Sequence, residues 1–314
     1  MQTRIGNIAR AATLVVLLLT ATALAQKYER KVEKRFEVQP NVSVNIVGKF
    51  GPVRVTGHDQ NIVEVRVVIT ADEDSYADAK ESADDVDVKI EGSRGSVRVE
   101  TDFERLLHNN DGRHSLNIAI TVTVPKPALV ELRNKFGSSH ATGVDGSVSL
   151  QNEFGSAVVT NCTNVRIVNA FGTTTASAIR GTLSIESKNG KVRAFDVPAC
   201  RIKNAFGEID LSDASGLVEI HGSMGAIKAK GIPGGSIANS YGSVVISLEK
   251  SFSGTIEAKT KFGSVDSDFP LEPRVKNREK QYGPVPEDLI GRIGSGNGRL
   301  RVLNEFGEIT IRKK

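Results

Sequence analysis

A short pattern of apolar and polar positions, centred on a glycine, recurs along most of this sequence. An aromatic residue precedes the glycine in eight copies, and three further glycines complete a set of eleven. Between Gly137 and Gly242 the copies are spaced by 17 or 18 residues. A fixed period of this kind predicts a repeat architecture, in which each unit packs on its neighbours. The eleven glycines are Gly51, Gly95, Gly137, Gly155, Gly172, Gly190, Gly207, Gly225, Gly242, Gly263 and Gly307.

The positions around each glycine alternate between apolar and polar. The residue five before it is apolar in all eleven copies, the one seven before it in ten, and the residue between them is never apolar. Apolar residues return two and four positions after the glycine, in nine and ten copies. Alternation with a period of two is typical of a strand that turns one face inward. Each unit is therefore predicted to be a strand, a glycine turn and a second strand.

A unit of this length is too short for a helical crossover between its strands. We therefore expect an all-β fold, a flattened β-solenoid with one winding per unit and neighbouring windings about 4.8 Å apart. Some ten windings would form a rod about 45 to 50 Å long.

Two columns of identical side chains are expected to stack at the turn. Asn stands three residues before the glycine in six copies, and its amides are expected to bond along the stack. For the aromatic column we favour a structural stack that buries apolar area at the corner. The alternative is a platform on which sugars or bases stack.

The segments that flank the regular repeat are predicted to cover its ends. Residues 26–129 form a β-rich cap with the first windings, and a helix near 71–84 begins at a capping box from Thr70 to Glu73. Residues 130–314 form the repetitive solenoid. A proline-containing loop interrupts it at 268–292, and Gly294 to Gly298 is expected to be a hairpin turn.

The first 25 residues have the order of a secretory signal peptide. Arg4 and Arg10 precede the apolar run 11–19, and the segment closes on Ala23-Leu24-Ala25. We expect cleavage before Gln26, no membrane span after it, and a secreted, periplasmic or cell-surface protein. An uncleaved anchor is the alternative, although the run is shorter than the roughly 20 residues of a spanning helix.

Composition agrees with a core of small stacked residues and argues against one class of partner. Only 5% of residues are aromatic and Trp is absent. The net charge is +4, and two of the cations lie in the first 25 residues. So balanced a charge does not give the basic field that nucleic acid needs, and we expect no nucleic acid partner.

The order of these motifs resembles a family of secreted bacterial β-solenoids. The resemblance rests on the V-T-V-P step at Val122 to Pro125, on the repeated N-x-F-G motif, and on the closing segment from Ile293 to Ile311. It covers roughly residues 35–312, and the family is labelled "putative adhesin" or domain of unknown function. Members usually have N-G at the turn and often Trp before Asp in the first winding, whereas here F-G predominates and His58 precedes Asp59. The resemblance implies the fold, and adhesion only through a label based on architecture.

Histidines and cysteines give no metal site or disulfide in this reading. His140 and His221 face outward five windings apart, about 24 Å, and cannot share a metal. His108 and His114 flank a polar loop with Asp111, which we interpret as solvated. Cys200 is expected in the core and Cys162 in a turn two windings away, so the two cysteines lie too far apart for a disulfide.

One pair of carboxylates comes near to a catalytic arrangement. Glu208 and Asp210 point outward from one strand, about 7 Å apart, which overlaps the spacing in inverting glycosidases. Lys191, Arg193 and Lys228 are expected on the same columns in the neighbouring windings. Basic neighbours lower a carboxylate pKa, the wrong direction for a general acid, so we interpret the group as cross-strand ion pairs.

The sequence thus predicts no catalytic residue, no cofactor-binding residue and no metal ligand. We expect a secreted non-catalytic module that contacts an envelope or surface macromolecule, either protein or glycan. The outward polar surface offered for this contact contains Ser138, Ser156, Thr173 and Ser243. Two alternatives stay open: a periplasmic scaffold that associates with itself end to end, and a polysaccharide-acting enzyme.

Overall fold

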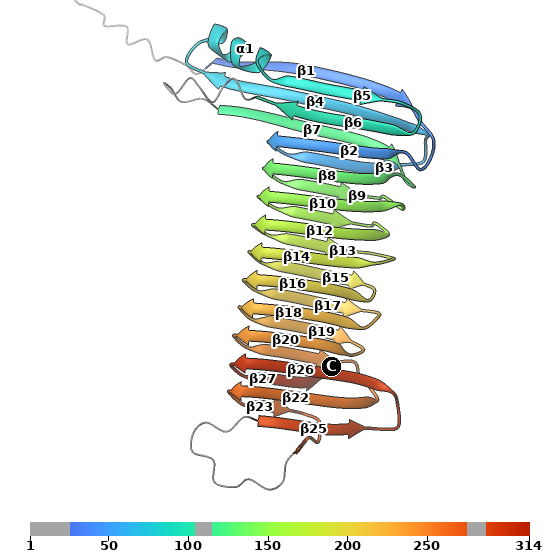
Figure 1. Cartoon of the computed structure of the whole chain (residues 1–314), viewed down its shortest axis with the longest axis vertical. Coiled ribbons are helices and arrows are strands. Elements are labelled where there is room, and N and C mark those ends of the chain that lie inside the picture. The colour runs from blue at the N-terminus through green and yellow to red at the C-terminus, as the bar shows by residue number, and fades with distance from the viewer. Residues whose placement is uncertain (1–25, 104–114, 275–286) are drawn as a thin grey trace, which may run out of the picture.

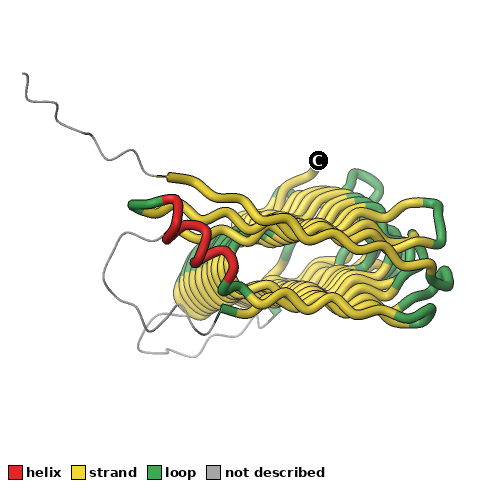
Figure 2. Tube along the Cα trace, turned by 90° about the horizontal axis from the view of Figure 1, so that it is seen from above, coloured by secondary structure: helices red, strands yellow, loops and turns green. Residues whose placement is uncertain are grey.

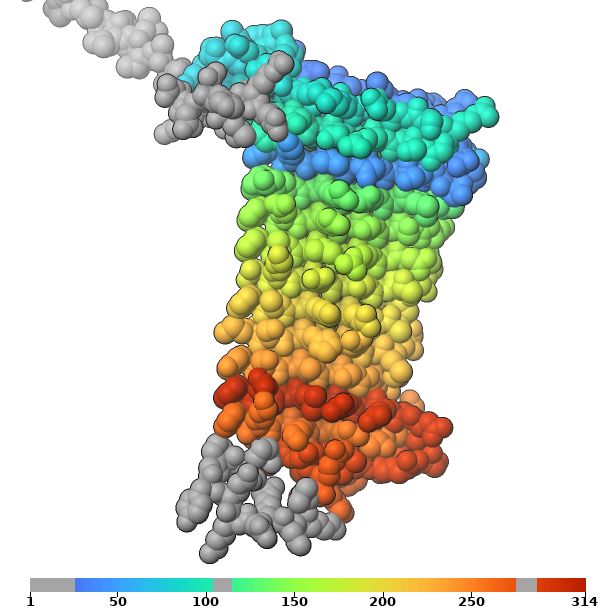
Figure 3. Space-filling model, in the orientation of Figure 1, coloured from blue at the N-terminus to red at the C-terminus, as the bar shows by residue number. Residues whose placement is uncertain are grey.

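The computed structural model describes residues 26–103, 115–274 and 287–314 of the chain. Their strands stack into a straight rod, with a helix at the N-terminal end (Figure 1). A view along the rod shows two layers of strands facing each other (Figure 2). The space-filling view shows a continuous body that is widest at its two ends (Figure 3).

Ten windings build the rod in the described residues, and each gives one strand to either layer. This confirms the predicted flattened β-solenoid. The windings are β2 (Ser43–Phe50) with β3 (Val53–His58), β8 (Leu129–Phe136) with β9 (Ser139–Thr142), β10 (Ser147–Phe154) with β11 (Ala157–Thr160), β12 (Asn164–Phe171) with β13 (Thr174–Ser177), β14 (Leu183–Asn189) with β15 (Val192–Val197), β16 (Cys200–Phe206) with β17 (Ile209–Ala214), β18 (Val218–Met224) with β19 (Ile227–Ile232), β20 (Gly235–Tyr241) with β21 (Val244–Leu248), β22 (Gly254–Phe262) with β23 (Val265–Ser267), and β26 (Gly298–Phe306) with β27 (Ile309–Lys313).

The inward columns of both layers form one continuous core. Leu150, Ile167 and Ile185 are partners in successive windings of one layer and are at most 1% exposed. Because neighbouring windings pair in parallel and in register, each core side chain packs on its counterpart above and below. Small and branched residues thus fill a long core that needs few aromatics.

The buried Asn column supports the turns in a way that differs from our expectation. The amide of Asn204 donates to the carbonyl of Gly190 in the preceding winding at 2.9 Å, and that of Asn304 donates to Gly242 at 2.8 Å. Between Asn residues the described part of the chain has one such bond, from Asn152 to Asn169 at 3.3 Å. The expected amide ladder is therefore largely wrong, because the turn carbonyls offer nearer acceptors.

The N-terminal cap completes both layers at one end of the rod. β1, β4 and β7 extend one layer beyond β3, and β6 and β5 extend the other beyond β2. Its elements are β1 (Gln26–Glu37), β4 (Ile62–Glu73), α1 (Tyr76–Asp84), β5 (Asp87–Gly92), β6 (Ser96–Asp102) and β7 (Ser115–Pro125). Gly95 joins β5 and β6, which pair antiparallel in one layer, so this copy of the pattern is a hairpin and not a winding.

The helix of the cap begins five residues later than the predicted capping box. Thr70 and Glu73 belong to β4, and Ser75 is the N-cap, whose hydroxyl accepts from the amide of Asp78 at 3.1 Å. The alternation of β4 continues through Thr70 and keeps it in the sheet. Arg30 of β1 closes the other end of α1, donating to the carbonyls of Ala83 and Val86 at 3.0 and 2.9 Å.

At the C-terminal end the order of windings in space differs from their order in sequence. The winding of β26 and β27 lies between that of β20 and β21 and that of β22 and β23. Beyond these lie β25 (Glu287–Ile293) and β24 (Glu272–Pro273). β25 pairs antiparallel with β22 and not with β26, so the predicted hairpin at Gly294 to Gly298 is wrong.

The segment predicted as a loop at 268–292 contains these two strands, β24 and most of β25. A strand was not expected there because the prolines break the repeat. Part of this segment, residues 275–286 with Pro284 and Pro286, lies outside the described residues.

Candidate functional site

The aromatic column follows the glycine turns along one long edge of the rod. Phe136 and Phe154 stack at 5.1 Å with an interplanar angle of 8°, and Phe154 and Phe171 at 5.0 Å and 3°. At the other end Phe306 stacks on Tyr241 at 4.8 Å and on Phe262 at 4.6 Å. We call this column the aromatic edge; in spatial order it contains Phe50, Phe136, Phe154, Phe171, Asn189, Phe206, Met224, Tyr241, Phe306 and Phe262.

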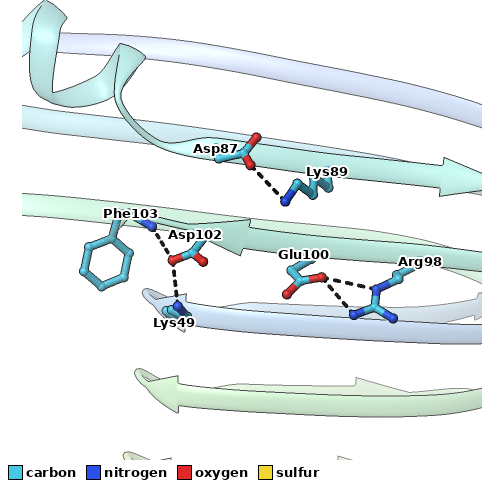
Figure 4. A network of polar contacts seen from close by, with 7 residues as sticks. All are labelled: Lys49, Asp87, Lys89, Arg98, Glu100, Asp102 and Phe103. Carbon is cyan, nitrogen blue, oxygen red and sulfur yellow. Dashed lines mark hydrogen bonds and ion pairs between the residues drawn. The ribbon is translucent and has the colours of Figure 1, made fainter. Parts of the chain in front are cut away.

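Seven of the eight rings stack in two runs, Phe50 to Phe171 and Tyr241 to Phe262, and cover most of their faces on one another. Phe206 lies between Asn189 and Met224 and has no ring stacked on it among the described residues. The first ring, Phe50, is covered on its outer side by Phe103, at 4.5 Å and 82°. Figure 4 shows how Phe103 is held: Asp102 accepts from the Phe103 amide at 2.7 Å and pairs with Lys49 at 2.6 Å. A sugar or base stacks on an exposed ring face. The geometry is therefore that of the structural corner stack and not of a stacking platform.

The rims of these rings are nevertheless at the surface. Phe154, Phe171 and Phe206 are 42%, 44% and 50% exposed, and Met224 and Tyr241 lie in the same range. The sequence predicted that the column would bury its area at the corner, and this is only half right. The period places a ring at each turn, but it does not show how far the ring projects beyond the backbone.

Small residues border part of the aromatic edge, and charged residues border the rest. Ser138, Ser156, Thr173 and Ser243 directly follow the turn glycines. They had been expected on a flat strand surface, but each lies in the turn before the strand begins. On the other border Ala170, Ala205 and Ser240 precede rings and Ser223 precedes Met224, whereas the residues before the other rings are charged: Lys49, Lys135, Glu153, Lys261 and Glu305. Short side chains on both sides leave the rims of Phe171 and Tyr241 as projecting groups of this edge.

The carboxylates of Glu208 and Asp210 lie beside the aromatic edge and form ion pairs with lysines, as predicted. Lys191 and Lys228 pair with Glu208 at 2.9 and 2.7 Å, and Lys191 approaches Asp210 to 3.8 Å. Hydrogen bonds from Lys228 and Lys191 lower the pKa of Glu208 to about 2. Arg193 lies next to Asp210 in the sheet register. A carboxyl with this pKa stays ionised at neutral pH and cannot act as a general acid.

The depressed pKa of Glu208 predicts a loss of stability in acid. The folded-state pKa is about 2 and the ordinary value is 4.5, so the contribution is present above pH 4.5 and is lost as pH falls toward 2. We expect Glu208→Gln to remove at most about 1 kcal/mol of this pH-dependent stability, because solvent screens the pair. Urea unfolding at pH 6 and pH 2.5 measures it. Glu153→Gln, at a carboxylate without an ion pair in the described chain, is the control; an equal change in both variants would contradict the prediction.

The histidines and cysteines that the structure describes are dispersed. His140 lies in β9 and His221 in β18, in opposite layers, and burial lowers the pKa of His140. His108, Asp111 and His114 lie outside the described residues. Cys162 and Cys200 are free and buried, and burial raises the pKa of Cys200 to about 12. No group of three potential metal ligands occurs in the described ranges.

A helix that could cross a membrane is absent from residues 26–103, 115–274 and 287–314.

Comparison with known proteins adds a family and several solved structures. The family model described as Toastrack DUF4097 matches residues 49–312. A protein from Parabacteroides distasonis called "putative lipid binding protein" has a TM-score of 0.50 and 13% identity, over 90% of this chain and 96% of that one. At this identity the likeness concerns the fold alone. No curated protein matches the chain.

Two further solved structures are similar over most of their length. One is a "putative cell adhesion protein" from Clostridium sporogenes, with a TM-score of 0.23 and 11% identity, covering 91% of this chain and 100% of that one. The other is a "putative adhesin" from Bacteroides fragilis, with a TM-score of 0.25 and 11% identity, covering 90% and 97%.

Proposed function

The chain belongs to the Toastrack DUF4097 family, and from this we propose that it is a non-catalytic interaction module of the cell surface or envelope, which contacts its partner along the aromatic edge. The observation that carries the proposal is a row of mostly apolar side chains over ten windings, which contains eight aromatic rings, six of them clearly exposed, and Met224, and which Asn189 interrupts. Large exposed apolar patches are uncommon on soluble monomers, and those that occur often mark an interaction site.

The geometry of the rings favours one kind of partner. Most of their faces are covered by stacking, so a neutral glycan would find few of the planes on which sugars stack. Rims with short polar neighbours suit an apolar strip on another protein, where side chains can pack between Ser156 or Thr173 and the rings. A protein partner is therefore favoured over a glycan.

The non-catalytic part of the proposal is supported by Glu208. It is the best-placed candidate acid among the described residues, and two lysines hold it ionised. The location at the surface or envelope rests on the signal-peptide pattern of residues 1–25, which lie outside the described residues. A protein that leaves the cytoplasm in this way would reach partners of the envelope or beyond.

Self-association end to end is the rival proposal, and the first strand argues against it. β1 forms the outer edge of its layer, and eight of its twelve residues are charged. Charged side chains on an edge strand oppose pairing with another chain. At the opposite end, β23 and β24 are only three and two residues long and offer little edge to extend.

A pull-down from envelope fractions tests the proposed contact surface. We expect the double variant Phe154→Ser, Phe171→Ser to retain less than a tenth of the partner captured by the wild-type chain, because two projecting rims are lost. Phe195→Ser is the matched control, since Phe195 is 47% exposed but lies on β15, away from the aromatic edge. Failure of the wild-type chain to capture any partner, or equal losses in both variants, would reject the proposal.

A further inference from the structure

A cluster of arginines surrounds one carboxylate at the C-terminal end of the rod. Three arginines pair with Glu257 of β22. Its Oε2 lies 3.3 Å from Arg274 Nη2 and 3.9 Å from Arg301 Nε, and its Oε1 lies 3.2 Å from Arg299 Nη2. Arg299 and Arg301 lie two residues apart on β26 and so share its outward face, and Arg274 follows β24. We call Arg274, Arg299 and Arg301 around Glu257 the arginine cluster.

The ion pairs of the described residues give the cluster more cations than carboxylates. Besides Glu257 they include Asp288, which Lys259 approaches to 3.1 Å and Arg274 to 3.9 Å. Among the described residues, the four cations and two carboxylates that these contacts join have a net charge of +2.

Other ion-pair networks in the described residues do not have this surplus. Two lysines meet two carboxylates around Glu208, and Arg312 alone meets Asp266 and Asp268. Most of the remaining pairs, such as Lys80 with Asp84, join single opposite charges. A surplus of two cations confined to one network is therefore a local feature of the C-terminal end of the rod.

The exposure of the groups shows where a ligand would approach. Glu257 is only 19% exposed, whereas Arg274, Arg299 and Arg301 are 46%, 67% and 52% exposed. The carboxylate thus lies beneath the guanidinium groups. A guanidinium has five N–H donors, and Glu257 has two acceptor oxygens for three such groups. Some N–H donors of the three arginines are therefore left on the solvent side. There the carboxylates do not fully offset the repulsion between the guanidinium groups.

We infer that the arginine cluster binds the oxyanion groups of an acidic polysaccharide. Arginine suits carboxylate, sulfate and phosphate groups because its planar fork donates two parallel hydrogen bonds. Among the described residues the cluster lies on an open sheet face, where a single free anion would compete poorly with water. A polymer that places successive charges along this face gains from each of them. This site is separate from the aromatic edge and does not depend on the function proposed for it.

Binding of the mature chain to immobilised polygalacturonate, at constant ionic strength, tests the inference. We expect saturable binding that weakens about tenfold in Arg299→Gln and in Arg301→Gln, since each loses a charge-assisted contact. Arg201→Gln is the matched control on the same face, where arginine has a carboxylate of its own, and should change affinity less than twofold. Glu257→Gln keeps the side-chain size, raises the net charge by one and should bind more tightly. Neutral dextran should not bind.

The outcomes separate the possible sources of the oxyanion. Inorganic sulfate that raises the melting temperature, without binding of polygalacturonate, would keep an anion site but overturn the polysaccharide. No response to either probe, or an equal loss in Arg299→Gln and Arg201→Gln, would overturn the site. The double variant at Phe154 and Phe171 should bind polygalacturonate as the wild type does, so failure at the aromatic edge and failure here are distinguishable.

Discussion

Gly190→Ala is expected to destabilise the rod by about 3 kcal/mol or more. Gly190 has a φ of +131°, and a Cβ there would lie 2.0 Å from the carbonyl oxygen of Gly172 in the neighbouring winding. That oxygen belongs to backbone that is fixed by pairing on both sides, so it cannot move away cheaply. Eight further turn glycines have φ between 115° and 138°, which explains why glycine marks the repeat. Chemical denaturation of the variant measures the loss.

A second glycine separates the clash from the backbone conformation. Gly143 has a φ of +71°, but a Cβ there would find its nearest neighbour, the Gly57 oxygen, at 3.6 Å. Gly143→Ala should therefore cost only about 1 to 2 kcal/mol, the price of the left-handed conformation. Equal losses in the two variants would show that close packing between windings does not restrict the turn.

Val302→Asp is expected to destabilise the C-terminal windings by about 4 kcal/mol while the middle of the rod stays folded. Val302 is fully buried on β26, between Ile237 of β20 and Ala258 of β22. A carboxylate there has no partner, and it disrupts pairing on both sides at once. In a solenoid each winding contacts only its neighbours, so the damage should stay local.

Hydrogen exchange measures this pattern along the chain. Amides of β22, β25 and β26 should lose protection, whereas those of β8, β10 and β12 should keep it. Leu303→Asp is the control on the same strand, because Leu303 is only partly buried and should cost less than about 1 kcal/mol. A uniform loss of protection over the whole rod would contradict the expected locality.

The repeat itself could be predicted because local geometry dictates it. A strand with one buried face needs apolar residues at every second position, and the turn needs a residue without Cβ, so both requirements appear in the sequence. The order of the windings could not be predicted in this way. Every winding presents similar edges above and below, and the period around Gly307 does not show that it inserts between those of Gly242 and Gly263. The pattern around Gly95 fits a hairpin equally well.

The two candidate sites differ in how far the sequence indicates them. The aromatic edge is a column of the repeat, so the sequence identifies its aromatic members. Only the exposure of the ring rims could not be predicted without the structure. The arginine cluster joins Glu257 to Arg299 and Arg301, which are more than forty residues away in sequence; Glu257 and Arg301 occupy the same position, six residues before the glycine, in consecutive copies of the repeat, so stacked windings place them side by side. Arg274 joins them from outside the repeat. The periodic pattern contains no signal for the contact with Arg274, which therefore required the structure.

The insertion of β26 and β27 also determines how the rod would respond to mechanical load. Hydrogen bonds between windings run along the rod, so a pull on one end peels windings from it in turn. A winding at a free end is held on one side, whereas β26 is held by both β20 and β22, and β27 by both β21 and β23. Tension applied at Lys313 must break both sets of bonds together. The winding of β26 and β27 thus resists separation at the point where tension would otherwise begin to unfold the rod.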